Sequence, residues 1–308
     1  MNSVLQAIFE PGFFTSFPVR MALLAGGMAA LVSGIVGTFT VLRGQSYAGH
    51  ALADISVTGG AASYLAGITP LWGFAGVGVA AAAAMDLIGV QRRRGRDLAT
   101  GVVRGAGLGL AALFLYWGAT TTSTTGATVT VLFGSIFTIS AATAAVAAVF
   151  AVIALGIVAV LYRPLLLGSA SPDLAFARGI PVRATGALCL VAMALAVSLS
   201  ALTIGAILST ALLVGPAATA MRLTSKPGLT VALSAVIGLA ATWIGVLLAY
   251  DSYYWPPTHH GWPVSFLVVA LVVLFYLLAQ FVVPHPPGTR RGRDATRLPA
   301  ALPSEAGA

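Results

Sequence analysis

The sequence predicts an all-α fold: a polytopic transmembrane helical bundle of about eight to nine spans plus a short re-entrant or interfacial helix. Between residues 17 and 283 the chain holds about nine long apolar runs, and its charges fall almost entirely between them. Hydrophobic residues make up 58% of the 308 residues and charged residues only 8%, a balance foreign to soluble domains. Runs of roughly 20 apolar residues cross the hydrocarbon core as helices, which satisfy their own backbone hydrogen bonds there.

The predicted spans follow the apolar runs in chain order. They are 17–42, 47–67, 70–90, 98–117, 142–162, 184–200, 202–221, 228–250 and 263–283. The segment 127–139 is apolar but too short to cross a membrane alone, so we expect a re-entrant or interfacial helix there. The membrane domain, 17–283, follows an N-terminal segment, 1–16. It precedes a Pro-, Arg- and Ala-rich tail, 284–308, which we expect to be disordered and cytoplasmic.

The distribution of charge predicts the orientation of the bundle. Basic residues cluster in the loops 92–96, 163–183 and 222–226 and after the last apolar run, and the positive-inside rule makes such segments cytoplasmic. The segments 118–126 and 251–261 contain no Lys or Arg, so we expect them to face outward. Nine spans with a cytoplasmic C-terminus put the N-terminus outside. Loops next to membrane lipid therefore explain the net charge of +8, and we expect no nucleic-acid partner.

One pair of ionisable residues lies inside an apolar run. His50 and Asp54 are four residues apart near the start of the second predicted span, so they share one face of a helix. Ionisable groups at membrane depth are costly and tend to be functional. An imidazole nitrogen and a carboxylate oxygen are suitable ligands for a divalent cation such as zinc or manganese. A buried His–Asp hydrogen bond that locks the helix is an equally good interpretation of this pair.

Other motifs narrow the class of protein. His259 and His260 form a weaker metal candidate in the outward segment 251–261, where a solvated loop is the better interpretation. Cys189 is the only cysteine, which excludes disulfides within the chain and cysteine-based metal clusters. The chain contains no P-loop, H-E-x-x-H or G-x-S-x-G motif. We therefore expect a chain that does not bind ATP through a P-loop.

Four stretches between about Val41 and Val273 carry motifs that are specific in combination. They are Val41–Arg43 with Ser46–Ala51, Leu132–Ile136, Tyr162–Leu167 with Asp173–Ala175 and Arg178–Val182, and Ile204–Leu208 with Ala211–Ala220. Together they resemble the permease subunit of bacterial ABC importers for zinc, manganese or iron. That family usually has an Asp in the second span and a His four residues later.

The resemblance bears directly on the His–Asp pair. The family's Asp aligns with His50 and its His with Asp54, so the two residues are exchanged while their spacing is kept. The resemblance therefore favours metal ligands over a structural hydrogen bond at this pair. Thr58 is a further departure, because the family often has Pro before the position of Gly59.

The resemblance also implies a function and a set of partners. The chain would be a multi-pass subunit of the bacterial cell (inner) membrane that moves a divalent metal ion, manganese, zinc or iron, into the cytoplasm. The resemblance further implies a transport subunit that is not an enzyme, has no ATPase site of its own and holds no permanently bound cofactor. A separate cytoplasmic ATP-binding subunit would drive it, an extracytoplasmic metal-binding lipoprotein would deliver the ion, and a second permease copy would complete a homodimer. The alternative is an ion-gradient-driven secondary transporter with His50 and Asp54 as a proton or cation relay. Such transporters often show internal repeats, and we find no convincing repeat here.

The long cytoplasmic segment 164–181 is the predicted contact with the ATPase. It has a proline at each end and amphipathic content between them, which suits a short helix lying across the membrane face. In the family this element docks in a groove of the ATPase and transmits its motion. The residues that the resemblance places in this contact are Asp173, Leu174, Ala175, Phe176 and Arg178.

Overall fold

The structure, a computed structural model, describes residues 13, 15–88, 96–121, 125–254 and 261–282. The predicted tail 284–308, most of the N-terminal segment 1–16, the arginines of 92–94, and His259 and His260 lie outside these residues. Every regular element in the described residues is helical, which confirms the all-α prediction.

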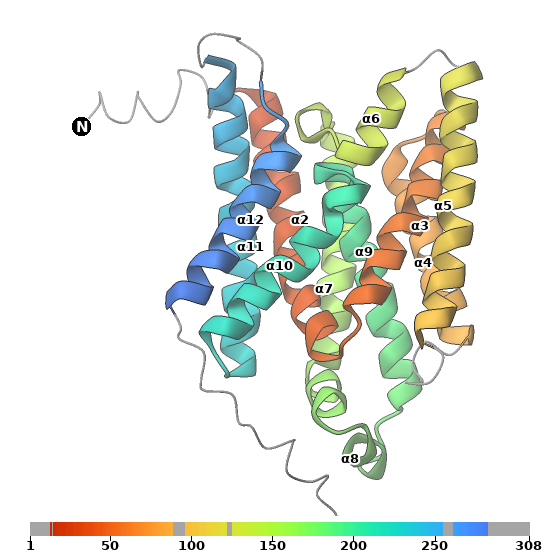
Figure 1. Cartoon of the computed structure of the whole chain (residues 1–308), viewed down its shortest axis with the longest axis vertical. Helices are drawn as coiled ribbons and strands as arrows, with labels where there is room; N and C mark the ends of the chain where they lie inside the picture. Colours follow the sequence, from red (N-terminus) through yellow and green to blue (C-terminus); the bar gives the residue numbers. More distant parts are fainter. Residues whose placement is uncertain (1–12, 14, 89–95, 122–124, 255–260, 283–308) are drawn as a thin grey trace, which may run out of the picture.

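Nine helices of the described chain have 18 residues or more, and shorter segments connect them. The long helices are α2 (Phe17–Leu42), α3 (Ser46–Leu65), α4 (Pro70–Ile88), α5 (Arg96–Thr121), α7 (Ala141–Ala170), α9 (Val182–Ile204), α10 (Ala206–Leu223), α11 (Pro227–Asp251) and α12 (Val264–Val282). The short segments are α6 (Thr125–Phe133), η1 (Ile136–Thr138), α8 (Pro172–Ala177) and η2 (Ser252–Tyr254). Figure 1 shows the long helices side by side in a single bundle.

Eight of the long helices are long and apolar enough to span a membrane. The ninth, α3, has sufficient length but carries His50, Asp54 and several hydroxyl side chains. It packs against α4, α5, α9 and α10, and most of its residues are buried. The surrounding helices therefore shield this polar helix from lipid, which is the environment that polar residues at membrane depth require.

Two of the predicted boundaries are wrong by several residues. α7 continues past the predicted end at residue 162 to Ala170, with Pro164 inside the helix. A proline inside a helix removes one backbone hydrogen bond, and the side chain of the neighbouring Leu165 is fully buried. α9 runs beyond residue 200 and ends before Gly205, which separates it from α10. The segment 164–181 is therefore not one loop, because its first third is the end of α7.

The short helix α6 and the turn η1 enter and leave the bundle at the same end (Figure 1), as predicted for a re-entrant helix. Two glycines with positive φ hold them there: Gly134 after α6, at 78°, and Gly205 after α9, at 87°. A Cβ atom on Gly134 would overlap the backbone nitrogen of Gly205, and one on Gly205 would overlap the carbonyl of Leu132. The two breaks in helical structure are therefore packed directly against each other.

The centre of the bundle is formed by α2 and α9, which are the most deeply buried of the eight apolar helices. The hydroxyl oxygens of Ser33 on α2 and Ser200 on α9 lie 2.7 Å apart and form a hydrogen bond between these two helices. Such bonds between small polar residues are characteristic of helix contacts in lipid. The core is thus held by a short polar contact as well as by apolar packing.

Glycines on α2 allow two further helices to approach it closely. A Cβ atom on Gly37 would overlap the carbonyl of Leu213 on α10, and one on Gly34 would lie 2.8 Å from the carbonyl of Ser234 on α11. The Ser234 hydroxyl donates to the Gly34 carbonyl at 2.8 Å. Backbones in direct contact maximise van der Waals packing where lipid supplies no hydrophobic driving force.

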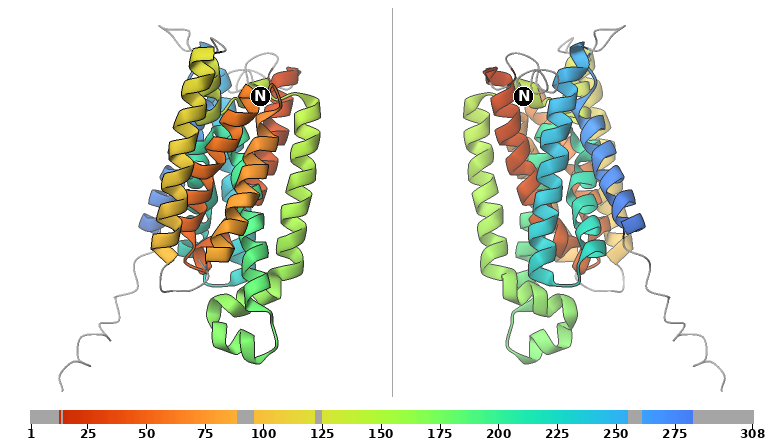
Figure 2. Two further views of the ribbon diagram at one scale, coloured as in Figure 1. Left: turned by 90° about the vertical axis from the view of Figure 1, so that its right-hand side faces the viewer. Right: turned by 90° about the vertical axis from the view of Figure 1, so that its left-hand side faces the viewer.

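Basic residues gather at the end of the bundle that carries α8. Those with described positions there are Arg43, Arg96, Arg163, Arg178, Arg183, Arg222 and Lys226. Arg20, in the first turn of α2, lies at the opposite end. By the positive-inside rule the α8 end faces the cytoplasm, and α12 begins at the outer end (Figures 1 and 2).

This orientation predicts the outcome of cysteine labelling in a Cys189→Ser background. Ala170→Cys, at the end of α7, should react with a membrane-impermeant maleimide only after cells are opened. Gly261→Cys, just before α12, should react in intact cells. Both positions are exposed, so a lack of access would reflect the membrane. Labelling of both from the same side would contradict the topology.

Gly37→Ala should destabilise the bundle, because the new methyl group would meet the backbone of α10. Overpacking of this kind costs about 1–3 kcal/mol. We expect a lower midpoint of thermal unfolding for the purified protein in detergent. Gly76→Ala on α4, where a Cβ atom has open space, is the matched control and should leave the midpoint unchanged. Equal midpoints for the two variants would show that the close contact at Gly37 is unimportant.

Candidate functional site

His50 and Asp54 lie in the second and third turns of α3 and face the same side of that helix. The His50 Nε2 and Asp54 Oδ2 atoms are 3.9 Å apart. This separation is too long for a direct hydrogen bond. The interpretation of the pair as a His–Asp hydrogen bond is therefore wrong for this structure, and the two side chains instead share a third partner.

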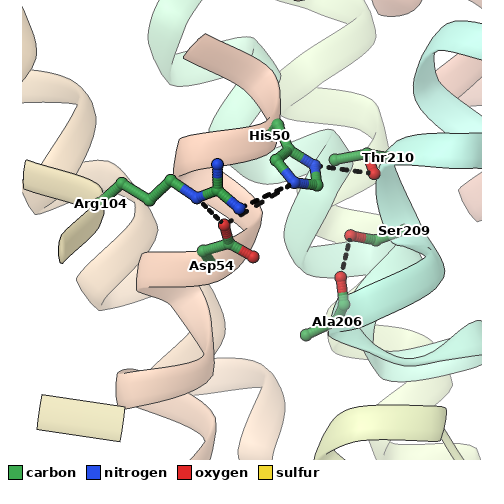
Figure 3. A network of polar contacts seen from close by, with 6 residues as sticks. All are labelled: His50, Asp54, Arg104, Ala206, Ser209 and Thr210. Atoms are coloured by element: carbon green, nitrogen blue, oxygen red, sulfur yellow. Dashed lines mark hydrogen bonds and ion pairs between the residues drawn. The ribbon is translucent and has the colours of Figure 1, made fainter. Parts of the chain in front are cut away.

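That partner is Arg104 of α5, which the sequence analysis did not identify. Its Nε donates to Asp54 Oδ2 at 2.5 Å, and its Nη2 lies 3.2 Å from His50 Nε2. Figure 3 shows the guanidinium reaching from the neighbouring helix to both side chains. The hydroxyl of Tyr47, in the first turn of α3, is a further hydrogen-bond partner of Arg104.

These contacts determine the tautomer of His50. A guanidinium can only donate hydrogen bonds, so His50 Nε2 must accept from Arg104 and carries no proton. The ring proton then lies on Nδ1, which is 3.2 Å from the hydroxyl oxygen of Thr210 on α10. The imidazole thus lies between two further helices, with its Nε2 facing Arg104 on α5 and its Nδ1 facing Thr210 on α10.

The site is half-buried and electrically balanced. The side chain of Asp54 is 15% exposed, whereas those of Arg104 and His50 are 32% and 40% exposed. An ionised carboxylate removed from water requires a paired charge, and Arg104 supplies it. The negative charge of Asp54 and the positive charge of Arg104 cancel each other. The more open flank of the site is the one formed by His50 and Arg104.

A close contact between α3 and α5 places Arg104 beside Asp54. One turn along α5 from Arg104, a Cβ atom on Gly107 would lie 2.5 Å from the Ile55 side chain. The Thr58 hydroxyl donates to the Gly107 carbonyl at 2.7 Å. This bond gives a physical reason for the departure from the family pattern at Thr58, because a proline there could not donate it.

The donor set of one chain is small. In the part of the chain that the structure describes, no group of three or more His, Cys, Asp or Glu side chains lies close enough together to hold a metal ion. His50 and Asp54 thus offer one nitrogen and one carboxylate, whereas a closed structural zinc site has four protein ligands. The arrangement suits an ion that is bound briefly.

A separate pocket of about 170 Å³ is lined by residues of α6 and η1 together with the end of α3 and the start of α4. Several hydroxyl groups line it, among them those of Tyr64, Thr130, Ser135 and Thr138. Neither His50 nor Asp54 contributes to its wall. The pocket is therefore distinct from the His–Asp–Arg site, which lies nearer the opposite end of α3.

The predicted ATPase contact contains the short helix α8, which lies beyond the bundle at its cytoplasmic end (Figure 2). The hydroxyl of Ser171 caps this helix by accepting from the backbone nitrogen of Leu174 at 3.3 Å. Phe176 is 77% exposed and Leu174 46% exposed, whereas Ala175 is buried. Arg178 is exposed, and the side chain of Asp173 lies outside the described part of the structure. A large aromatic side chain with this exposure is available to a partner.

Comparison with known proteins identifies relatives along nearly the whole bundle. The ABC 3 transport family matches residues 17–282. The manganese transport system membrane protein MntC of Listeria innocua is 30% identical over 247 residues, which cover 80% of this chain and 85% of that protein. The manganese import system permease protein ScaB of Streptococcus parasanguinis is 28% identical, over 86% of this chain and 91% of its own.

A solved structure has the same fold. PsaBC from Streptococcus pneumoniae, determined in complex with Fab, superposes with a TM-score of 0.76 at 24% sequence identity. The match covers 92% of this chain and 97% of the other. The helical arrangement described above is thus one already observed in a membrane protein.

Proposed function

The chain belongs to the ABC 3 transport family, and we propose on this basis that it moves manganese into the bacterial cytoplasm as the membrane-spanning subunit of an ABC importer. Its multi-pass fold and eight apolar helices suit this location. Relatives matched over most of their length are named as manganese transport proteins. Membership of this family argues against the alternative function, that of a gradient-driven secondary transporter.

The observation that carries the proposal is the pair of metal-ligand side chains on α3, inside the bundle. Imidazole and carboxylate together accept the borderline divalent ions, and the carboxylate favours manganese. Two ligands from one chain hold an ion only weakly, which suits transport because the ion must leave again. The 40% exposure of the His50 side chain leaves room for further ligands, from water or from a second permease copy related by symmetry.

The proposal includes three further partners. A cytoplasmic ATP-binding subunit supplies the energy, and α8 is the element of this chain that contacts it. An extracytoplasmic metal-binding lipoprotein delivers the ion at the outer end, where the pocket lined by α6 lies. A second copy of the permease completes the translocation path. Support for the α8 contact comes from the exposed aromatic side chain on a helix that projects from the bundle.

The first test concerns the ligand pair. Asp54→Ala should abolish uptake of radiolabelled manganese into vesicles that contain the ATPase, because it removes the only carboxylate of the site. The double exchange His50→Asp with Asp54→His keeps both donors in the commoner family order and should retain part of the uptake. All variants should reach the membrane at normal levels.

Asp86→Ala is the matched control for this test. Asp86 on α4 has the same side-chain exposure as Asp54, 15%, and also pairs with an arginine, Arg183, at 3.8 Å. It lies outside the site, so its replacement should leave uptake near the wild-type level. Uptake at the wild-type level by Asp54→Ala would show that Asp54 is not a metal ligand.

The second test concerns α8. Phe176→Ala should reduce the manganese transported per ATP hydrolysed, because it removes the largest apolar group at the proposed ATPase contact. Val160→Ala on α7 is a suitable control, since Val160 is 80% exposed but lies within the membrane-spanning part of the bundle. Transport and ATP hydrolysis are measured together in proteoliposomes. Unchanged coupling in Phe176→Ala would show that this side chain is not part of the contact.

A further inference from the structure

We propose that Arg104 is a tethered cation that occupies the metal position of the empty permease and changes places with the transported ion. This inference rests on the proposed function, because it takes His50 and Asp54 as the ligands. It adds to that function a residue that positions the two ligand side chains and competes with the ion for them, although it is itself neither a ligand nor an acid. The evidence is the set of contacts that Arg104 makes.

Arg104 uses the same atoms that a metal ion would use. Its guanidinium donates to Asp54 Oδ2 and to His50 Nε2, which are the lone pairs available for coordination. Bonds from a divalent ion to imidazole nitrogen and carboxylate oxygen are about 2.1 Å long, so one ion can bridge two atoms 3.9 Å apart. The ion and the guanidinium therefore compete for the same place.

Charge makes this competition exclusive. Arginine stays protonated in proteins, so it cannot accommodate a divalent cation by losing its proton. Two positive centres that share one carboxylate repel each other strongly in a half-buried environment. Binding of the metal must consequently displace the guanidinium from Asp54, and departure of the metal lets it return.

The surroundings of Arg104 allow such a movement. Its side chain is 32% exposed, and α5 has open space at the Cβ positions of Gly101 and Gly105, the first of which lies one turn away. The Tyr47 hydroxyl, a partner of Arg104 outside the ligand pair, belongs to a side chain that is 42% exposed. The guanidinium can thus leave Asp54 without a change in the helix contact at Gly107.

The return of Arg104 also prepares the ligands for the next ion. Its guanidinium contacts Asp54 Oδ2 and His50 Nε2 together, and the Thr210 hydroxyl lies 3.2 Å from His50 Nδ1. Arg104 therefore weakens metal binding by competition while it keeps both donor side chains directed toward one position.

The test is a titration of the full-length permease in lipid nanodiscs with Mn²⁺ alone. Arg104→Gln and Arg104→Met both remove the competing charge. Methionine is the better tolerated side chain in a membrane helix because it is apolar. Each variant should bind Mn²⁺ about tenfold more tightly than wild type or better, equivalent to about 1.4 kcal/mol. Arg104→Lys keeps a cation and should stay near wild type. Arg163→Gln, an equal change of charge on an exposed residue at the end of α7, should leave the Kd unchanged.

Asp54→Asn, alone and combined with Arg104→Met, separates the ligand assignment of His50 and Asp54 from the proposed exchange of Arg104 with the ion. If Asp54→Asn weakens Mn²⁺ binding but neither Arg104→Gln nor Arg104→Met strengthens it, the exchange is refuted and the ligand assignment stands. If Asp54→Asn has no effect in either background, the ligand assignment fails, and the exchange fails with it. Tighter binding in both neutral variants that is lost with Asp54→Asn supports both the ligand assignment and the exchange.

Discussion

The close approach of helix backbones at small residues is the constraint on which this structure depends. Lipid tails are as apolar as the helices themselves, so helix association relies on packing and a few interhelical hydrogen bonds. Gly37 brings α2 against α10, and Gly107 brings α5 against α3. The contact at Gly107 places Arg104 within reach of Asp54. The contact at Gly37 holds α10, which carries Thr210, against α2. The geometry of the polar site is therefore a result of backbone contacts elsewhere.

The polar site brings a requirement of stability and the proposed transport role into opposition. A carboxylate on α3 is paired with a guanidinium from α5, and if Asp54 is a metal ligand as proposed, this pairing occupies an atom that the ion would need. A site with a permanently free carboxylate would bind metal more tightly but would be costly when empty. In the proposed exchange, sharing the carboxylate between an internal and a transported cation would avoid both a buried unpaired charge and an ion that cannot leave.

The sequence predicted most of the bundle because length and apolarity identify the eight apolar helices, and it also predicted the re-entrant segment 127–139. It did not predict the true end of α7 or the break at Gly205, which depend on tertiary packing around Leu165 and Gly134. Arg104 was not predicted as a site residue, although it is the only charged residue in the predicted span 98–117. Its pairing with Asp54 could not be predicted, because Asp54 is 50 residues away in the chain. Thr210 gave no signal, since hydroxyl residues are common throughout these helices.

The neutrality of the empty site has an electrical consequence. Moving one elementary charge through a potential of 100 mV involves about 2.3 kcal/mol. The charges of Asp54 and Arg104 cancel when the two side chains are paired, so a movement of the pair carries no net charge through the membrane potential. If His50 and Asp54 bind the transported ion as proposed, the loaded site carries charge at this position, and an interior-negative potential favours its inward movement. Under that proposal the ion pair lets the membrane voltage assist the loaded step without opposing the return of the empty site.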